Sequence, residues 1–117
     1  MIRISDEVRE SDAVVALETT IVAHGFPPGA GAAVGLESER RVRAAGAVPA
    51  TIGVLDGEIR VGLTESELER FDSSARKAGP RELGVSVARG ETGAMIVGGT
   101  LAVCRAAGIR FMGTGGT

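Results

Sequence analysis

The stretch AVVALETTIVAHG, residues 13–25, places a carboxylate, two hydroxyls and an imidazole directly after an apolar run. These groups belong to Glu18, Thr19, Thr20 and His24, and His24 is the chain's one histidine. An ionised side chain inside a buried strand loses much of its hydration unless it is paired, so either the strand ends at Glu18 or the carboxylate has a task.

The position of Glu18 suits acid–base chemistry. Sheet-based active sites collect their residues at the C-terminal ends of buried strands, and partial burial favours the protonated carboxyl group that a general acid needs. A structural carboxylate, paired with an arginine or with backbone amides, is the alternative. His24 could likewise take part in catalysis. The alternatives are a surface position and a hydrogen-bonding role in a loop.

Two further features suit contact with a phosphate. Lys77 is the only lysine among 13 basic residues, and a compact ammonium binds phosphate as a point charge. The TGGT turn at residues 114–117 follows an apolar run, and its amides could hold an oxyanion or a phosphate. For Lys77 the alternative is a composition that favours Arg and leaves one Lys by chance. For residues 114–117 the alternative is an ordinary tight turn.

A sheet must position these residues. Residues 13–17 are apolar on both faces, as in a strand of a covered parallel or mixed sheet. Residues 49–56 predict a second strand, Asp56-Gly57 predicts a hairpin turn, and EIRVGL predicts the returning strand. Residues 109–113 predict a further buried strand.

The pattern of apolar residues and caps predicts four helices. Thr64 and Glu67 form a capping box, Pro80 suits a first helical position, and Gly46 and Gly108 suit helix ends. The predicted helices cover 32–45, 65–75, 81–89 and 93–107. The GAGAAVG run at 29–35 superficially matches a dinucleotide fingerprint, but Val34 takes the place of the third glycine and no strand leads into it.

The composition limits the possible partners. The chain has 117 residues, 44% of them apolar and 24% charged, with a net charge of −2, which is typical of one globular domain. Its arginines are scattered and it has no Trp or Tyr, which argues against a nucleic-acid surface. No segment has the ~20 apolar residues of a membrane span and the N-terminus does not resemble a signal peptide, so we expect a cytoplasmic protein.

The single cysteine, Cys104, cannot form an internal disulfide and lies in an apolar helical stretch. We expect a buried, inert thiol rather than a nucleophile. With one Cys and one His, the chain has no structural zinc site of its own.

Three linked blocks resemble the N-terminal part of the pseudouridine-5′-phosphate glycosidases, a family that includes the indigoidine synthase A-like proteins. The blocks are ALETTIVAHGFP, GAVPATIGVLDGEIRVGLTESEL and GAMIVGGTLAVCRAAGIRFMGTGG, in the family's order and with similar spacing. The resemblance implies a three-layer α/β/α fold with a mixed or mostly parallel sheet. We interpret residues 1–117 as a single N-terminal portion of that domain, incomplete at the C-terminus.

The resemblance also implies an activity. Family members reversibly split the C–C glycosidic bond of pseudouridine 5′-phosphate, which gives uracil and ribose 5-phosphate. A lysine Schiff base is thought to supply the electron sink. A divalent metal, typically manganese, organises water near the phosphate, and the enzymes are usually homotrimers.

Site residues carry over by position. Glu18 falls on the family's proton donor, while Lys77 and Val97 fall on substrate-contacting residues. His24 falls on the family's A-H-G element, and with Thr19 and Thr20 it is expected to support the site from behind. The RKAGPREL surroundings of Lys77 depart from the family's K-V-S-R-R-D-L, and Met95 and Ile96 replace two threonines before Val97, which removes two hydroxyls.

The family's G-G-V-H-R loop, its metal-binding Asp and its Schiff-base lysine would all follow Thr117. The resemblance therefore implies no metal ligand within these 117 residues, and we expect them to be inactive alone. The alternative to a piece of an enzyme is a non-catalytic remnant, a sugar-phosphate binding module or an oligomerisation module.

Overall fold

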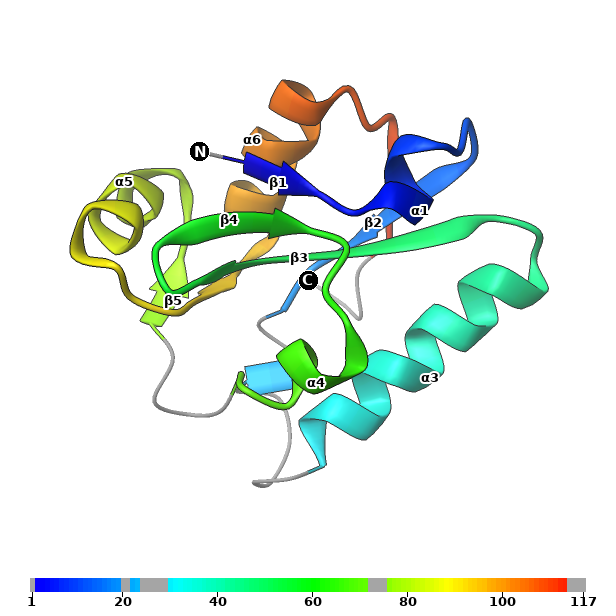
Figure 1. Cartoon of the computed structure of the whole chain (residues 1–117), viewed down its shortest axis with the longest axis horizontal. Coiled ribbons are helices and arrows are strands. Elements are labelled where there is room, and N and C mark those ends of the chain that lie inside the picture. The colour runs from blue at the N-terminus through cyan, green and yellow to red at the C-terminus, as the bar shows by residue number, and fades with distance from the viewer. Residues whose placement is uncertain (1, 20–21, 24–29, 72–75, 114–117) are drawn as a thin grey trace.

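The computed structural model describes residues 2–19, 22–23, 30–71 and 76–113, with the backbone alone at 76–78 and 80 (Figure 1). In chain order the elements are β1 (Ile2–Ile4), α1 (Asp6–Arg9), β2 (Val14–Leu17), α3 (Gly31–Ala44), β3 (Val48–Leu55), β4 (Glu58–Val61), α4 (Glu65–Leu68), β5 (Arg76–Ala78), α5 (Pro80–Arg89), β6 (Gly93–Met95), α6 (Val97–Ala107) and β7 (Phe111–Gly113).

The described strands form one mixed sheet, as the family resemblance implies. The strand order is β1-β4-β3-β2-β7, and β6 pairs with both β3 and β5. The pairs β1–β4, β2–β3, β2–β7 and β5–β6 are parallel, whereas β3 is antiparallel to β4 and β6. The predicted hairpin is confirmed: Asp56 and Gly57 have φ angles of 50° and 79°, which a primed two-residue turn requires.

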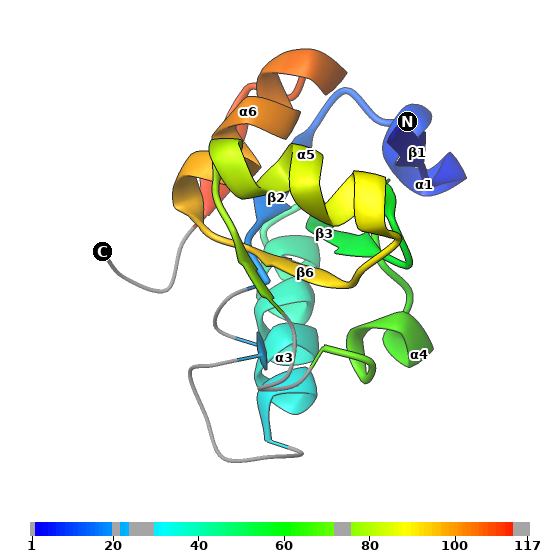
Figure 2. The same ribbon diagram turned by 90° about the vertical axis from the view of Figure 1, so that its left-hand side faces the viewer.

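Helices cover both faces of the sheet, which gives three layers (Figure 2). Helices α5 and α6 lie over one face, and α3 and α4 lie over the other. Strand β3 shows why: Ala50, Ile52 and Val54 belong to one apolar cluster, while Leu55 belongs to a second. Because side chains alternate across a strand, an eight-residue apolar strand supplies core to both layers.

The sequence prediction is wrong at Gly93–Met95. We predicted a helix from Gly93 onward, but these three buried residues form β6, and α6 begins only at Val97. Small apolar residues satisfy a helix pattern and a buried strand pattern equally well, so periodicity cannot separate them. Pairing with β3 and β5 on both sides decides in favour of the strand.

Other boundaries differ as well. The capping box of α4 is confirmed, with Thr64 and Glu67 exchanging both hydrogen bonds, but the helix ends at Leu68 rather than near Ala75. Residues 72–75 lie outside the described part. The elements β1, α1 and β5 were not predicted, because runs of three or four residues carry no readable period.

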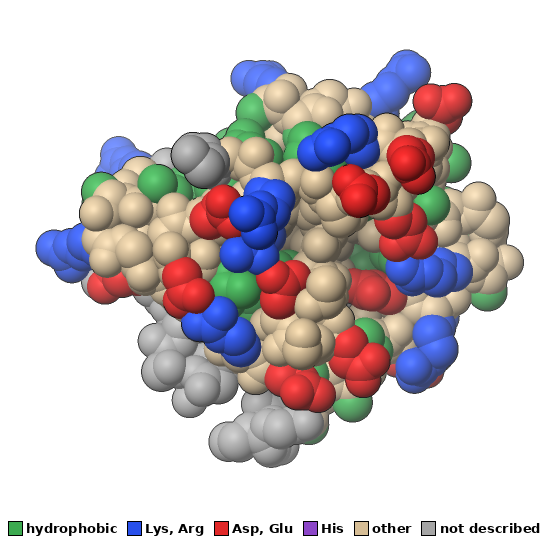
Figure 3. Space-filling model, in the orientation of Figure 1, with side chains coloured by type: hydrophobic (Ala, Val, Ile, Leu, Met, Phe, Trp, Pro, Cys, Tyr) green, Lys and Arg blue, Asp and Glu red, His purple; other side chains and the backbone are tan. Residues whose placement is uncertain are grey.

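In the part of the chain that the structure describes, no helix is long and apolar enough to cross a membrane. The chain's surface carries charges of both signs. On the face drawn in Figure 3, acidic and basic side chains lie intermixed.

Candidate functional site

Strands β2 and β6 meet end to end along one side of β3. Strand β2 runs parallel to β3 and pairs as far as Leu17 with Thr51, while β6 runs antiparallel and pairs from Gly53 with Ala94. Only Ile52 of β3 lies between these two registers. The C-terminal ends of β2 and β6 therefore face each other across a single residue of β3.

Two more strands end at the same place. Strand β7 is parallel to β2 and places Gly113 opposite Leu17, and β5 is parallel to β6 and places Ala78 opposite Met95. Four C-terminal strand ends thus converge, and we name this place the strand-end junction. Parallel sheets gather functional groups at such ends, and here two pairs of parallel strands do so from opposite directions.

Glu18 follows the C-terminal end of a strand, as predicted, and this places it at the strand-end junction. It follows the last residue of β2 directly and is partly buried. The strand ends before the carboxylate, so Glu18 does not interrupt the ladder. This placement allows a carboxyl group to reach a ligand at the junction without placing a charge inside the core.

Thr19 is fully buried and joins three strands. Its hydroxyl donates to the Ile52 carbonyl at 2.9 Å and accepts from the Met95 amide at 2.6 Å. Its own amide donates to the Met95 carbonyl at 3.2 Å, and its carbonyl accepts from the Ala23 amide at 3.1 Å. Thr19 therefore supplies, from one residue, the hydrogen bonds that a ladder would provide where β2 and β6 stop.

Val97 begins α6 immediately beyond β6. Ile96 is the N-cap residue and has no side-chain acceptor to offer to the first turn of the helix, and Val97 is partly buried. Backbone amides at the start of a helix carry partial positive charge and favour anions. The family resemblance implies that Val97 contacts the substrate, and a contact through its backbone is compatible with this position.

The remaining predicted residues are described in part or not at all. The backbone of Lys77 lies on β5 opposite Ala94, one residue before the end of the strand, and so belongs to the same junction. Thr20, His24 and the TGGT turn lie outside the described residues. The structure thus brings Glu18, Val97 and the backbone of Lys77 to the strand-end junction.

Glycines in α3 allow Val22 to lie close to the helix. A Cβ on Gly31 would lie 1.7 Å from the Val22 carbonyl oxygen, and one on Gly35 would lie 3.0 Å from a Val22 methyl. Both Val22 and Ala23 are buried. The glycine run that superficially matched a dinucleotide fingerprint therefore allows the backbone at Val22 to pack closely against α3.

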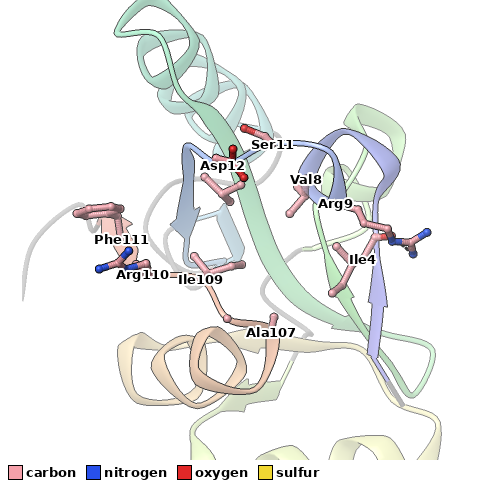
Figure 4. A pocket seen from close by; sticks show the side chains of 11 residues that line it. Ile4, Val8, Arg9, Ser11, Asp12, Ala107, Ile109, Arg110 and Phe111 are labelled. Atoms are coloured by element: carbon pink, nitrogen blue, oxygen red, sulfur yellow. Dashed lines mark hydrogen bonds between the residues drawn. The ribbon is translucent and has the colours of Figure 1, made fainter.

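A pocket of about 540 Å³ lies elsewhere (Figure 4). Its lining includes Asp12 and Val14 at the start of β2, Ile109 and Arg110 before β7, and Phe111. These residues lie at the N-terminal ends of β2 and β7, whereas Glu18 follows the C-terminal end of β2. None of the predicted site residues that the structure describes lines this pocket, so it is separate from the strand-end junction.

Two other expectations concern reactive groups. Cys104 is buried, and burial raises the pKa of its thiol, which agrees with the inert thiol we predicted. Within the described residues, no three His, Cys, Asp or Glu side chains are grouped so as to hold a metal ion.

The profile of the family described as "Indigoidine synthase A like protein" matches residues 3–117. The chain belongs to this family. Among curated relatives, the pseudouridine-5′-phosphate glycosidase of Saccharopolyspora erythraea is 49% identical over 119 residues, which are 97% of this chain and 39% of the relative. The enzyme of the same name from Dickeya dadantii is 41% identical over 99% of this chain and 39% of its own length.

Two solved structures agree with the fold. A family member from Thermotoga maritima matches all of this chain and 40% of its own, with a TM-score of 0.87 and 33% identity. The prealnumycin C-glycosynthase AlnA, solved with ribulose 5-phosphate, matches 96% of this chain and 38% of its own, with a TM-score of 0.78 and 39% identity. The chain spans about two-fifths of the length of these relatives.

Proposed function

We propose that these residues form the proton-donor part of a pseudouridine-5′-phosphate glycosidase, which reversibly splits its substrate into uracil and ribose 5-phosphate. The observation that carries this proposal is the strand-end junction, where Glu18, Val97 and the backbone of Lys77 meet. Curated relatives bearing this enzyme name support it, as does AlnA, which was solved with a sugar phosphate.

Each residue has a distinct task in this proposal. Glu18 delivers a proton to the uracil ring as the C–C glycosidic bond breaks, which a protonated carboxyl group beside the sugar can do. The ammonium of Lys77 and the first amides of α6, beginning at Val97, bind the anionic sugar phosphate. Thr20 and His24 contact these residues, rather than the substrate, and keep them in position.

The family's other groups are assigned outside these residues. The described side chains do not fit a metal site, so we place the manganese ligand elsewhere in the intact family domain, together with the Schiff-base lysine. We also propose the family's trimeric assembly and a cytoplasmic location for the intact domain.

A chimera tests the proposal. Residues 1–117 replace the matching segment of the Saccharopolyspora erythraea relative, and uracil release from pseudouridine 5′-phosphate is followed with manganese present. We expect turnover from the chimera and none from the 117 residues alone. Glu18→Gln should lower the chimera's kcat by about 10²- to 10⁴-fold, the usual contribution of general acid catalysis, while exposed Glu10→Gln should not.

A non-catalytic sugar-phosphate binding module is the second candidate, and Met95 and Ile96 favour it. Met95 is fully buried, and Ile96 packs at 3.0 Å from the place where a Cβ on Gly79 would lie. Neither side chain offers a hydroxyl to a ligand. A folded chimera that binds ribose 5-phosphate but releases no uracil, even after both residues are changed to Thr, would support this candidate against the glycosidase.

A further inference from the structure

The strand-end junction contains a gap in the sheet's hydrogen bonding that must be filled. On this side of β3, β2 pairs up to Thr51 and β6 pairs from Gly53. The carbonyl of Ile52 therefore lies outside the regular ladders with these two strands. The amide of Met95 likewise lies at the very end of β6. An unmade hydrogen bond at a buried backbone group is destabilising, so both groups need a partner here.

The hydroxyl of Thr19 is suited to both partners. It is a donor and an acceptor in one atom, and it uses both capacities, toward Ile52 at 2.9 Å and from Met95 at 2.6 Å. Gly53 makes the approach possible, since a Cβ there would lie 3.3 Å from Thr19 Oγ1 and 2.6 Å from Phe71 Cζ.

The neighbours of Thr19 give this contact its functional meaning. Glu18 precedes Thr19 in the chain, while Ile96 and Val97 follow Met95. The hydrogen bond from the Met95 amide to Thr19 therefore connects the neighbour of Glu18 to the residue that precedes the N-cap of α6. We propose that Thr19 is a positioning residue, whose hydroxyl fixes the separation between Glu18 and the start of α6 for a sugar-phosphate ligand.

This inference rests on the proposed function only for the identity of the ligand. A change of 1 Å in such a separation is enough to weaken ligand binding and catalysis, because the interactions depend steeply on geometry. The hydroxyl itself is fully buried and is not required to touch the ligand.

Thr19→Val and Thr19→Ser test the inference in the 117-residue chain. Valine keeps the shape but removes the hydroxyl, whereas serine keeps the hydroxyl. By NMR we expect Thr19→Val to lose at least about tenfold in hydrogen-exchange protection at the Met95 amide and to shift the amide signals of Glu18 and Val97. Thr19→Ser should restore both readouts.

Thr51→Val is the matched control. Thr51 is also buried in this region, but its hydroxyl donates to Glu39 on α3 at 2.6 Å and not across the junction. This variant should lower the stability without moving the signals of Glu18 and Val97. If both valine variants perturb those signals equally, or if Thr19→Val leaves them unchanged, the inference is wrong.

Ribose 5-phosphate supplies the ligand readout. At a temperature where all variants are folded, we expect Thr19→Val to weaken its Kd about tenfold, and Thr19→Ser and Thr51→Val to stay within about twofold of the wild type. If the wild type does not bind ribose 5-phosphate, the proposed function loses its support. The exchange and shift measurements at Met95, Glu18 and Val97 then still decide the inference about Thr19.

Discussion

Single residues on α3 show how burial and ion pairing act in opposite directions on the same helix. Glu39 is half-buried against β3, and this burial raises the pKa of its carboxyl group above the ordinary 4.5, although the Thr51 hydroxyl opposes the shift. Glu7 and Arg43, which pair with each other at 2.8 Å, have opposite effects on Glu39: the Arg43 charge lowers its pKa and the Glu7 charge raises it. Glu37, which is exposed, has its pKa lowered by the hydrogen bond and charge of Arg40.

These two carboxyl groups predict opposite pH dependences. The folded state binds the Glu39 proton more tightly than the unfolded chain does, so its contribution to stability is present below about pH 4.5 and is lost as the pH rises through the folded-state pKa. The Glu37 contribution is present above about pH 4.5 and is lost as the pH falls through its lowered pKa.

Glu39→Gln and Glu37→Gln test this pair by urea denaturation at about pH 4 and about pH 7. The free energy of unfolding of Glu39→Gln, relative to wild type, should rise between the two pH values. That of Glu37→Gln should fall, by a smaller and salt-sensitive amount because the pair is exposed. Slopes of the same sign for both variants would contradict the assignment.

At the scale of elements, the close approach of β3, Thr19 and Phe71 depends on one glycine. Gly53→Ala would bring a Cβ to 2.6 Å from Phe71 Cζ, and Phe71 is itself buried. We expect a loss of about 1–3 kcal/mol in the free energy of unfolding, as for overpacking in a core.

Gly84→Ala is the control for Gly53→Ala. Gly84 is exposed on α5, where an added Cβ meets no atom within 4 Å. Alanine there should stabilise the chain by about 0.5–1 kcal/mol, because it restricts the unfolded chain and favours the helix. Urea denaturation measures both changes, and a Gly53→Ala variant as stable as the wild type would show that Phe71 can move without cost.

Much of the element order could be predicted from local chemistry. Asp56-Gly57, the Thr64 capping box and Gly46 at the end of α3 act through their own backbone conformations, so their sequence signals hold in the structure. Strand β6 could not be predicted, because Gly93–Met95 become a strand only through β3 and β5. In the same way, the sequence was enough to place Glu18 at the end of a strand. The hydrogen bonds of Thr19 could not be predicted, because they depend on Met95, which lies 76 residues away on β6.

At the scale of the whole molecule, charge is divided along the chain. Residues 1–75 carry 7 basic and 13 acidic residues, whereas residues 76–117 carry 6 basic and 2 acidic ones. The basic part contributes Lys77 and Val97 to the strand-end junction, and the acidic part contributes Glu18. The excess of basic residues in the later part would favour an anionic ligand such as the proposed sugar phosphate.

The most direct test of this account is to map ribose 5-phosphate binding on the ¹⁵N-labelled 117-residue chain by NMR. We expect the amide signals of Glu18, Lys77 and Val97, at the strand-end junction, to shift. The signals of Asp12, Ile109 and Arg110, around the separate pocket, should stay unchanged. Shifts confined to the residues of that pocket, with Glu18 and Val97 unaffected, would contradict the assignment of the functional site.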